Sequence, residues 1–301
     1  QAGLVAAEHI RLLGQQRRLP QLLQGRPDLE QLAIVVEQRP HLGGQIRPIR
    51  VERSSAGMRL LESEVNDADT SRPLLGKPTP CIGREHELGV LELTVNACID
   101  ESAPRAVVMI GAPGIGKSRL CHEFLRRLAT RFPEHQVLLA RGDAMSRGAA
   151  CGVLGRALRR RFAVDDGETL AARQATIRTA ISRRVPGPEA LQVAEFIGEL
   201  CGVGFPDADS VKLRAARQDP RIMSDQLRQA FTTLLREECR ATPTVLVLDD
   251  LQWGDAFTVK LVEAALRELH DQPLMVLAFA RPEIADSFPN LWKGLAQQII
   301  V

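Results

Sequence analysis

The stretch GAPGIGKS, Gly111–Ser118, contains the residues whose types and spacing point most directly to chemistry. It matches the pattern G-x-x-x-x-G-K-[ST] at every fixed position. The three glycines let the backbone turn tightly, so that its N–H groups can approach phosphate oxygens. We expect Lys117 to reach the outer phosphates and the Ser118 hydroxyl to ligate Mg²⁺. The stretch therefore predicts a binding site for a nucleoside triphosphate.

The residues on either side of this stretch predict the structure that it needs. Ala106–Ile110 is a short apolar run rich in β-branched residues, which is typical of a buried parallel strand. Apolar residues recur at helical spacing from Leu120 to Leu128, so we expect a helix to follow. The positive N-terminal end of that helix would point at the bound anion. The expected nucleotide-binding residues of this region are Gly111, Ala112, Pro113, Gly114, Ile115, Gly116, Lys117, Ser118 and Arg119.

Two carboxylates, Asp249 and Asp250, directly follow another apolar run, Val245–Leu248, which predicts a buried strand. Ligands of such folds bind at the carboxyl ends of the strands, so both acids are expected beside the phosphates. We expect Asp249 to hold Mg²⁺ through the water shell of the ion. Asp250 is expected to orient or deprotonate the attacking water. The alternatives are an ordinary strand-end acid for Asp249 and a simple loop cap for Asp250.

Arg281 directly follows a further strand candidate, Leu274–Ala280, and is expected at the same edge of the sheet. A guanidinium there could sense the γ-phosphate or stabilise charge in the transition state. An exposed arginine without a role is the alternative. Other arginines gather on predicted helices, where we expect them to face solvent. These clusters are Arg126-Arg127, Arg159–Arg161 and Arg183-Arg184.

Strand and helix signals alternate from about residue 76 onward. This alternation predicts an α/β fold of three layers, in which helices cover both faces of a mostly parallel sheet. Helical patterns run from Cys151 to Arg240, between the strand candidates Gln136–Ala140 and Val245–Leu248. We therefore predict a helical insertion between the second and third strands, and a last strand at Gln298–Val301.

The sequence predicts two parts, and only the second can be assigned a fold and a function. Residues 1–75 are expected to be largely irregular or helical, with the polar stretch Ser63–Pro73 as a linker. Residues 76–301 are expected to form the nucleotide-binding domain. The chain opens on Gln1 and closes on an apolar run, so we expect it to be part of a longer polypeptide.

Composition restricts the partners. The chain has 39 Lys and Arg against 37 Asp and Glu, a net charge of +2, which does not favour nucleic acid or a membrane surface. No apolar run approaches the length of a membrane span. The six cysteines lie far apart without a C-x-x-C pair, which predicts free, mostly buried thiols and a cytoplasmic protein.

Four segments occur in the order seen in the STAND signalling ATPases, which are relatives of the AAA+ and Orc1-like ATPases. They are CIGREHELGVLE, GAPGIGKSRL, VLVLDDLQWGD and LAFARPE. The sequence most resembles the ATPase modules that lie between a protein-kinase or nucleotide-cyclase domain and helical repeats in large bacterial regulators. The resemblance covers about Gly76–Val301. It implies ATP and Mg²⁺ as cofactors and neighbouring domains as partners, and it is compatible with self-association.

The resemblance also implies roles for particular residues. The tripeptide Ile82-Gly83-Arg84 would lie near the adenine, and Arg281 would match the sensor arginine of the family. Asp250 stands where fast AAA+ ATPases have a glutamate, and this shorter carboxylate favours a slow switch. The helical lid that the family places after the last core strand is missing from these residues.

Together these features predict a module that binds ATP·Mg²⁺ and hydrolyses it slowly, so that the bound nucleotide sets the conformation of neighbouring domains. Two alternatives use the same phosphate loop. An initiator-type AAA+ ATPase would need a basic element that contacts DNA, which the near-neutral charge does not support. A small-molecule kinase would need an acceptor pocket and an arginine-rich lid, and the sequence identifies neither.

Overall fold

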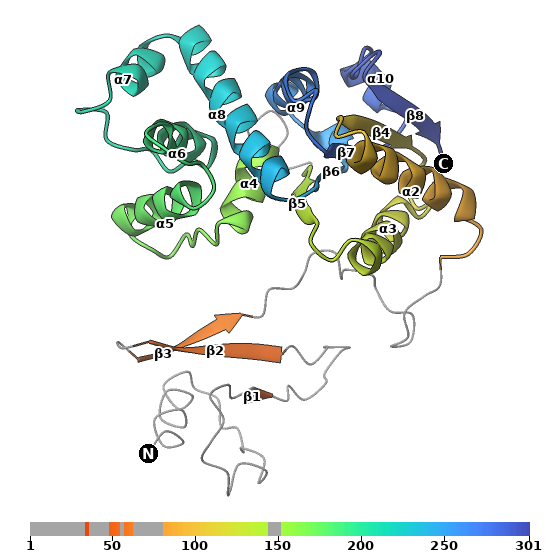
Figure 1. Ribbon diagram of the computed structural model, residues 1–301, viewed down its shortest axis with the longest axis horizontal. Coiled ribbons are helices and arrows are strands. Elements are labelled where there is room, and N and C mark those ends of the chain that lie inside the picture. Colours follow the sequence, from red (N-terminus) through yellow and green to blue (C-terminus); the bar gives the residue numbers. More distant parts are fainter. Residues whose placement is uncertain (1–33, 36–47, 55–56, 63–80, 144–151) are drawn as a thin grey trace, which may run out of the picture. The chain divides into compact units, whose positions relative to one another are not determined.

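The computed structural model describes residues 34–35, 48–54, 57–62, 81–143 and 152–301 (Figure 1). The chain divides into two units, Gln1–Val65 and Asn66–Val301. The expected domain boundary at residue 76 and the expected linker at residues 63–73 lie outside the described residues.

The N-terminal unit contains a small antiparallel sheet. Strand β2 (Pro48–Ser54) pairs with β1 (Ile34–Val35) on one side and with β3 (Gly57–Glu62) on the other. The prediction of a largely irregular or helical segment is wrong at these strands. Apolar and polar residues alternate over part of each strand, with Ile49 and Val51 in β2 and Met58 and Leu60 in β3, and this alternation is typical of strands.

The second unit is built on a five-stranded sheet with the order β5-β6-β7-β4-β8, in which every neighbouring pair is parallel. The prediction of a parallel α/β fold is therefore confirmed. Strand β4, which precedes the phosphate loop, is not a neighbour of β6, which ends in Asp249, because β7 lies between them. The strands are β4 (Arg105–Ile110), β5 (Gln136–Arg141), β6 (Thr244–Asp249), β7 (Leu274–Ala280) and β8 (Ala296–Ile300).

Helices cover both faces of this sheet (Figure 1). Because side chains alternate across a strand, Val107 and Met109 of β4 join one apolar cluster and Ala106 and Val108 join the other. The first cluster also contains residues of α2 (Glu85–Asp100) and α3 (Lys117–Arg131). The second contains residues of the remaining long helices. The predicted three layers are thus present.

The predicted helical insertion lies between β5 and β6. Side-chain caps start three of its helices: Thr169 accepts from Ala172 N, Ser210 from Leu213 N, and Asp219 from Arg221 N. The helices are α4 (Gly152–Arg161), α5 (Leu170–Ser182), α6 (Glu189–Leu200), α7 (Val211–Gln218) and α8 (Pro220–Ala241). After β6 follow η4 (Leu251–Trp253), α9 (Ala256–Glu268), and, beyond β7, α10 (Ile284–Ser287).

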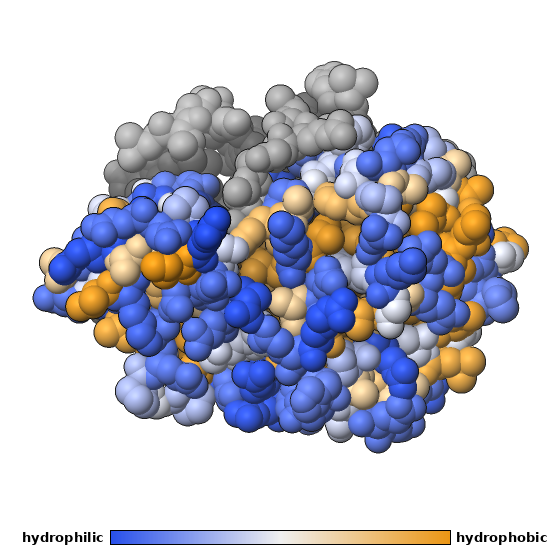
Figure 2. Space-filling model, turned by 90° about the horizontal axis from the view of Figure 1, so that it is seen from above, coloured by the Kyte–Doolittle hydropathy of each residue, from blue (hydrophilic) through white to orange (hydrophobic). Residues whose placement is uncertain are grey.

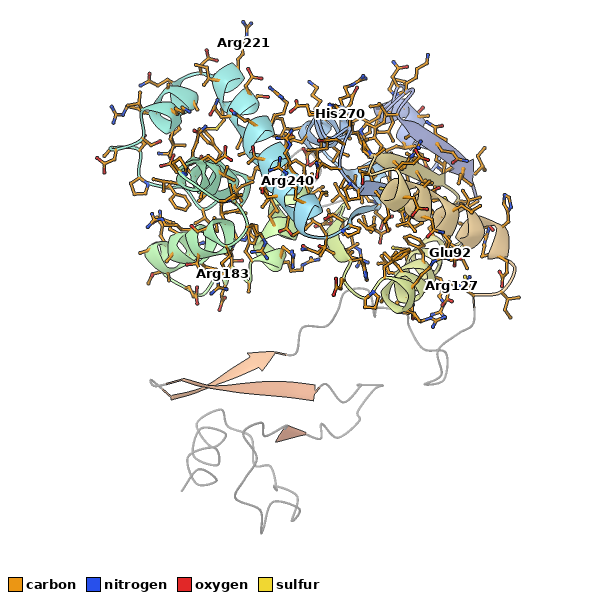
Figure 3. The ribbon with its side chains drawn as sticks, in the orientation of Figure 1. Glu92, Arg127, Arg183, Arg221, Arg240 and His270 are labelled. Atoms are coloured by element: carbon orange, nitrogen blue, oxygen red, sulfur yellow. The ribbon has the colours of Figure 1, made fainter. Side chains whose placement is uncertain are left out.

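The arginine clusters pair with acids more than the sequence suggested. In the insertion, Arg184 Nε donates to Glu238 Oε1 at 2.5 Å and Arg161 Nη2 donates to Glu238 Oε2 at 3.3 Å. On the other face of the sheet, Arg127 Nη1 of α3 donates to Glu92 Oε1 of α2 at 3.1 Å (Figure 3). The prediction of purely solvent-facing clusters is wrong for these three arginines, because their partners lie far away in the sequence.

Polar side chains cover much of the face shown in Figure 2, and hydrophobic side chains gather there in smaller patches. Within the part of the chain that the structure describes, no helix is long and apolar enough to cross a membrane. Four described cysteines are buried free thiols, as predicted, and burial raises the pKa of each to about 12. They are Cys98, Cys121, Cys201 and Cys239.

Candidate nucleotide-binding site

The sheet brings the predicted site residues to one edge. Ile110 pairs with Ala280 and Leu248 pairs with Ala278, so β4, β6 and β7 end side by side. The loops that follow these parallel strands therefore leave the sheet at the same carboxyl edge, where ligands bind in such folds. The predicted site residues that lie at this edge are Gly111 after β4, Asp249 and Asp250 at the end of β6, and Arg281 after β7.

The phosphate loop between β4 and α3 has the backbone that its glycines predict. Gly114 and Gly116 have φ of +81° and +99°, a backbone region that residues other than glycine rarely adopt. Gly111 is needed for space, because a Cβ there would lie 3.0 Å from Ile115 Cγ2 and 3.1 Å from the Val301 carbonyl oxygen. The loop can thus bring its backbone close to a ligand.

The first turn of α3 is open to an anion. Its N-cap is Gly116, which has no side chain to cap the helix, and the first turn contains no acidic residue. The first N–H groups of a helix lack partners within the helix, and the helix dipole places partial positive charge there. Ser118 is exposed in this turn, and Arg119, the next residue, is half-buried. A phosphate group would satisfy these donors.

Lys117 is held in place by the loop that it follows. Its side chain is buried, and Nζ donates to Gly111 O at 2.7 Å and to Ala112 O at 3.0 Å. Burial lowers the pKa of Lys117, and the nearby charge of Asp250 opposes this shift. An ammonium group has three N–H donors, so one stays available to a ligand. Both acceptors are neutral carbonyls, so neither pairs with the positive charge of Lys117.

Asp249 is a buried carboxylate, 4% exposed, at the end of β6. Its Oδ1 accepts from Asp250 N at 3.1 Å, and its Oδ2 accepts from Arg141 Nε at 3.2 Å. Burial raises the pKa of Asp249, as does the charge of Asp250, while Arg141 lowers it. Arg141 therefore favours the charged form of a carboxylate that burial would otherwise penalise.

Asp250 is fixed by its backbone and by a buried neighbour. Its φ of +54° is a left-handed conformation, which aspartate tolerates better than most residues. Gln252 Nε2 donates to Asp250 Oδ1 at 2.8 Å, and Gln252 Oε1 accepts from Arg281 N at 3.0 Å. The guanidinium of Arg281 lies 5.7 Å from the centroid of the Trp253 ring. Gln252 thus links the ends of β6 and β7. It connects Asp250, which is predicted to act on the attacking water, with Arg281, which is predicted to sense the γ-phosphate.

The segment before α2 contacts the phosphate loop. Arg84 is the N-cap residue of α2, and its Nη2 donates to Ile115 O at 3.0 Å. Gly83 has φ of +74°, and Ile82 is 81% exposed. The predicted adenine-side residues are therefore adjacent to the loop, with an apolar side chain open to solvent.

The oxygen donors at this edge suit Mg²⁺. They are the Ser118 hydroxyl and the Asp249 carboxylate. Within the described ranges, no group of three or more His, Cys, Asp or Glu could hold a metal ion. Mg²⁺ keeps several waters and is usually bound by one or two protein oxygens together with substrate phosphates. The donor set thus fits an ion that arrives with a nucleotide.

Two residues of this site were not predicted from the sequence. Arg141 directly follows the strand candidate Gln136–Ala140 but received no predicted role, although its position at the end of an apolar run resembles that of Asp249. Gln252 lies two residues after Asp250 inside a motif, but its bond to the Arg281 backbone joins residues 29 apart. Asp255, in the same motif, caps α9: its Oδ1 accepts from Thr258 N at 2.7 Å.

Comparison with known families agrees with this geometry. The profile of the AAA ATPase domain matches residues 80–277, which is more than half of the chain. The chain belongs to this family. The predicted relationship to AAA+ ATPases is thereby confirmed, and all the site residues described above except Arg281 fall within the matched span.

Among curated proteins, an uncharacterized protein of Rhizobium meliloti (strain 1021) is 26% identical to this AAA ATPase over 221 residues. The match covers 69% of this chain and 19% of the relative. The chain thus spans about a fifth of the length of this relative.

Three solved structures are similar at low identity. Cdc6p of Pyrobaculum aerophilum is 14% identical with a TM-score of 0.38, over 73% of this chain and 46% of that one. The Aeropyrum pernix ORC2 protein, in ADPNP–ADP complexes, is 13% identical with a TM-score of 0.37, over 79% and 52%. The Aeropyrum pernix ORC1 protein, in complex with DNA, is 15% identical with a TM-score of 0.36, over 72% and 44%.

Proposed function

We propose that this AAA ATPase domain binds ATP together with Mg²⁺, hydrolyses ATP slowly, and uses the bound nucleotide to switch the conformation of neighbouring domains. The observation that carries the proposal is the convergence at one sheet edge. There an open glycine loop and the buried Lys117 lie at the same edge as the paired acids Asp249 and Asp250. This is the arrangement that positions a triphosphate and the charges around it.

Each part of the site has a role in this proposal. The loop N–H groups and the first turn of α3 hold the β- and γ-phosphates, and Lys117 donates its remaining N–H to an outer phosphate oxygen. Ser118 and Asp249 would hold Mg²⁺, which supplies charge neutralisation of the phosphates when bound. Ile82, Gly83 and Arg84 would lie against the adenine. Arg281 would sense the γ-phosphate.

Slow hydrolysis is proposed because of the state of Asp250. Its carboxylate would orient the attacking water or accept a proton from it. Aspartate is one methylene shorter than glutamate, and one oxygen of Asp250 already accepts from Gln252. A short, engaged carboxylate suits a switch that holds its nucleotide for long periods better than a fast motor.

The signalling role is part of the proposal. The chain covers only a fifth of its curated relative, so we propose that further domains act with this one. By the family resemblance, these would be a kinase or cyclase domain on one side and helical repeats on the other. Residues 76–301 would be the ATPase domain of such a cytoplasmic regulator.

The test is direct binding and single-turnover hydrolysis of ATP by the full chain, with Mg²⁺ and with EDTA. We expect ATP binding that Mg²⁺ strengthens, and slow release of phosphate. The same assay with duplex DNA and with candidate phosphate acceptors separates the alternatives. Stimulation by DNA would favour an initiator-type ATPase, and transfer of phosphate to an acceptor would favour a kinase. Absence of nucleotide binding would overturn the proposal.

A further inference from the structure

The residue pair at the ends of β5 and β6 carries a further inference. Arg141 is the last residue of β5 and Asp249 the last residue of β6, and the parallel register places them opposite each other. Arg141 Nε donates to Asp249 Oδ2 at 3.2 Å. The proposed Mg²⁺ ligand therefore already has a cationic partner.

The two partners differ in their surroundings. The side chain of Asp249 is 5% exposed and that of Arg141 is 39% exposed. Asp249 ends a strand that is buried along its whole length, and its other oxygen accepts from the backbone. Within the described residues, Asp249 is the one acceptor that the structure gives to the Arg141 guanidinium. The carboxylate is thus fixed, whereas the guanidinium can leave toward solvent.

A magnesium ion that uses Asp249 would change this balance. An ion held by Asp249 would bring two positive charges close to the same carboxylate. A guanidinium and a divalent cation at such a distance repel each other strongly near a protein interior. The Arg141 guanidinium and the magnesium ion therefore weaken each other's interaction with the Asp249 carboxylate.

We propose that Arg141 and nucleotide-bound Mg²⁺ compete for Asp249, so that Mg²⁺ binding releases Arg141. The inference rests on the proposed function, since it takes Asp249 as the magnesium-binding acid. Arg141 is then a positioning residue: it keeps Asp249 oriented without the ion, and it raises the Mg²⁺ concentration that the site requires. Its backbone C=O also accepts from Arg156 Nη2 of α4 at 3.3 Å. Release therefore takes place where the helical insertion contacts the sheet.

The experiment measures the affinity of the full chain for adenylyl imidodiphosphate, a non-hydrolysable ATP analogue, across a range of Mg²⁺ concentrations. In Arg141→Gln, we expect the half-saturating Mg²⁺ concentration to fall about tenfold, the effect of losing one charge-assisted competitor. Affinity in EDTA should change less than about twofold. Arg141→Lys keeps the charge and should stay close to wild type.

Arg127→Gln is the matched control, because Arg127 is 36% exposed and also pairs with acids, Glu92 and Glu123, neither of which is a predicted site residue. Its Mg²⁺ dependence should equal that of wild type. An unchanged or higher half-saturating concentration in Arg141→Gln would overturn the competition. If wild type binds the analogue neither in Mg²⁺ nor in EDTA, the proposed function itself falls, and the competition with it.

A measurement on the wild type does not depend on the folding of any variant. In the analogue complex with EDTA, the Arg141 Nε–H should give a protected NMR signal, since it donates to Asp249. Addition of Mg²⁺ should abolish that protection, while the Arg127 Nε–H stays unchanged. An Arg141 signal that keeps its protection in Mg²⁺ would contradict release.

Discussion

The carboxyl edge of the sheet and the helical insertion both bury charged side chains, but they compensate them differently. In the insertion, both oxygens of Glu238 accept from guanidinium groups, of Arg184 and Arg161. At the sheet edge, the acceptors that the described residues give to the Lys117 ammonium are neutral carbonyls, from Gly111 and Ala112.

The difference shows which buried charges are structural. A carboxylate paired with two guanidinium groups has little charge left for a ligand, so it stabilises the contact among α4, the turn after α5, and α8. An ammonium held by carbonyls keeps its charge and one N–H, and its burial is compensated fully only when an anion arrives. We infer that the edge is built for an exchange of partners and the insertion is not.

The largest expected effect is on turnover. Asp250→Asn keeps the shape of the side chain but removes its ability to accept a proton, so we expect single-turnover hydrolysis to fall by about 10²-fold or more. Binding of ATP·Mg²⁺ should stay nearly intact. If hydrolysis is unaffected, the edge binds nucleotide without acting on it. If binding is lost instead, the roles of the two acids are reversed.

The next effect concerns the metal. Asp249→Asn should remove most of the gain in ATP affinity that Mg²⁺ provides, about tenfold or more, because a charged ligand becomes a neutral one. Affinity in EDTA should change little. Calorimetric titration with and without Mg²⁺ measures both quantities. A full Mg²⁺ gain in this variant would show that another group holds the ion.

A smaller effect is expected in the insertion, on stability alone. Glu238→Gln leaves two guanidinium groups without a charged partner, and we expect a loss of about 1–2 kcal/mol in the free energy of unfolding. Glu237→Gln is the matched control: Glu237 pairs with Arg240, which is 58% exposed, so the loss should stay below about 0.5 kcal/mol. Urea unfolding measures both. A weakened ATP affinity in a folded Glu238→Gln protein would contradict the division between the two regions.

The smallest effect is expected from removing the N-terminal residues. A chain shortened to begin at Leu74 should bind ATP as the full chain does, because the described site residues all follow residue 81. Circular dichroism checks the fold and calorimetry the affinity. A folded but non-binding short chain would place the domain boundary earlier, nearer to the division at Val65 and Asn66.

The sequence predicted the local parts of this structure well. The phosphate loop, its strand and its helix are encoded in one continuous stretch, and glycine spacing and apolar periodicity suffice to find them. Asp249 and Asp250, at the end of β6, were predicted for the same reason. The hairpin of β2 and β3 was missed although its alternation is also local, because the surrounding prolines and glycines suggested an irregular segment.

Contacts between distant residues could not be predicted in the same way. Arg141 and Asp249 are 108 residues apart, and Arg161 and Glu238 are 77 apart. Periodicity shows which residues face a core, but the strand order decides which strand ends meet. The sequence did not predict that β5 lies next to β6, so it could not assign a partner to Asp249.

The most direct test of the account is calorimetric titration of ATP·Mg²⁺ into wild type and Lys117→Ala. Lys212→Ala is the matched control, since Lys212 lies in the insertion and donates to Gln192. We predict that Lys117→Ala weakens ATP affinity at least about tenfold, because a charge-assisted contact in a buried site contributes roughly 1.5–3 kcal/mol. Lys212→Ala should bind as wild type does. Equal affinities for wild type and Lys117→Ala would contradict the assignment of this edge as the nucleotide site.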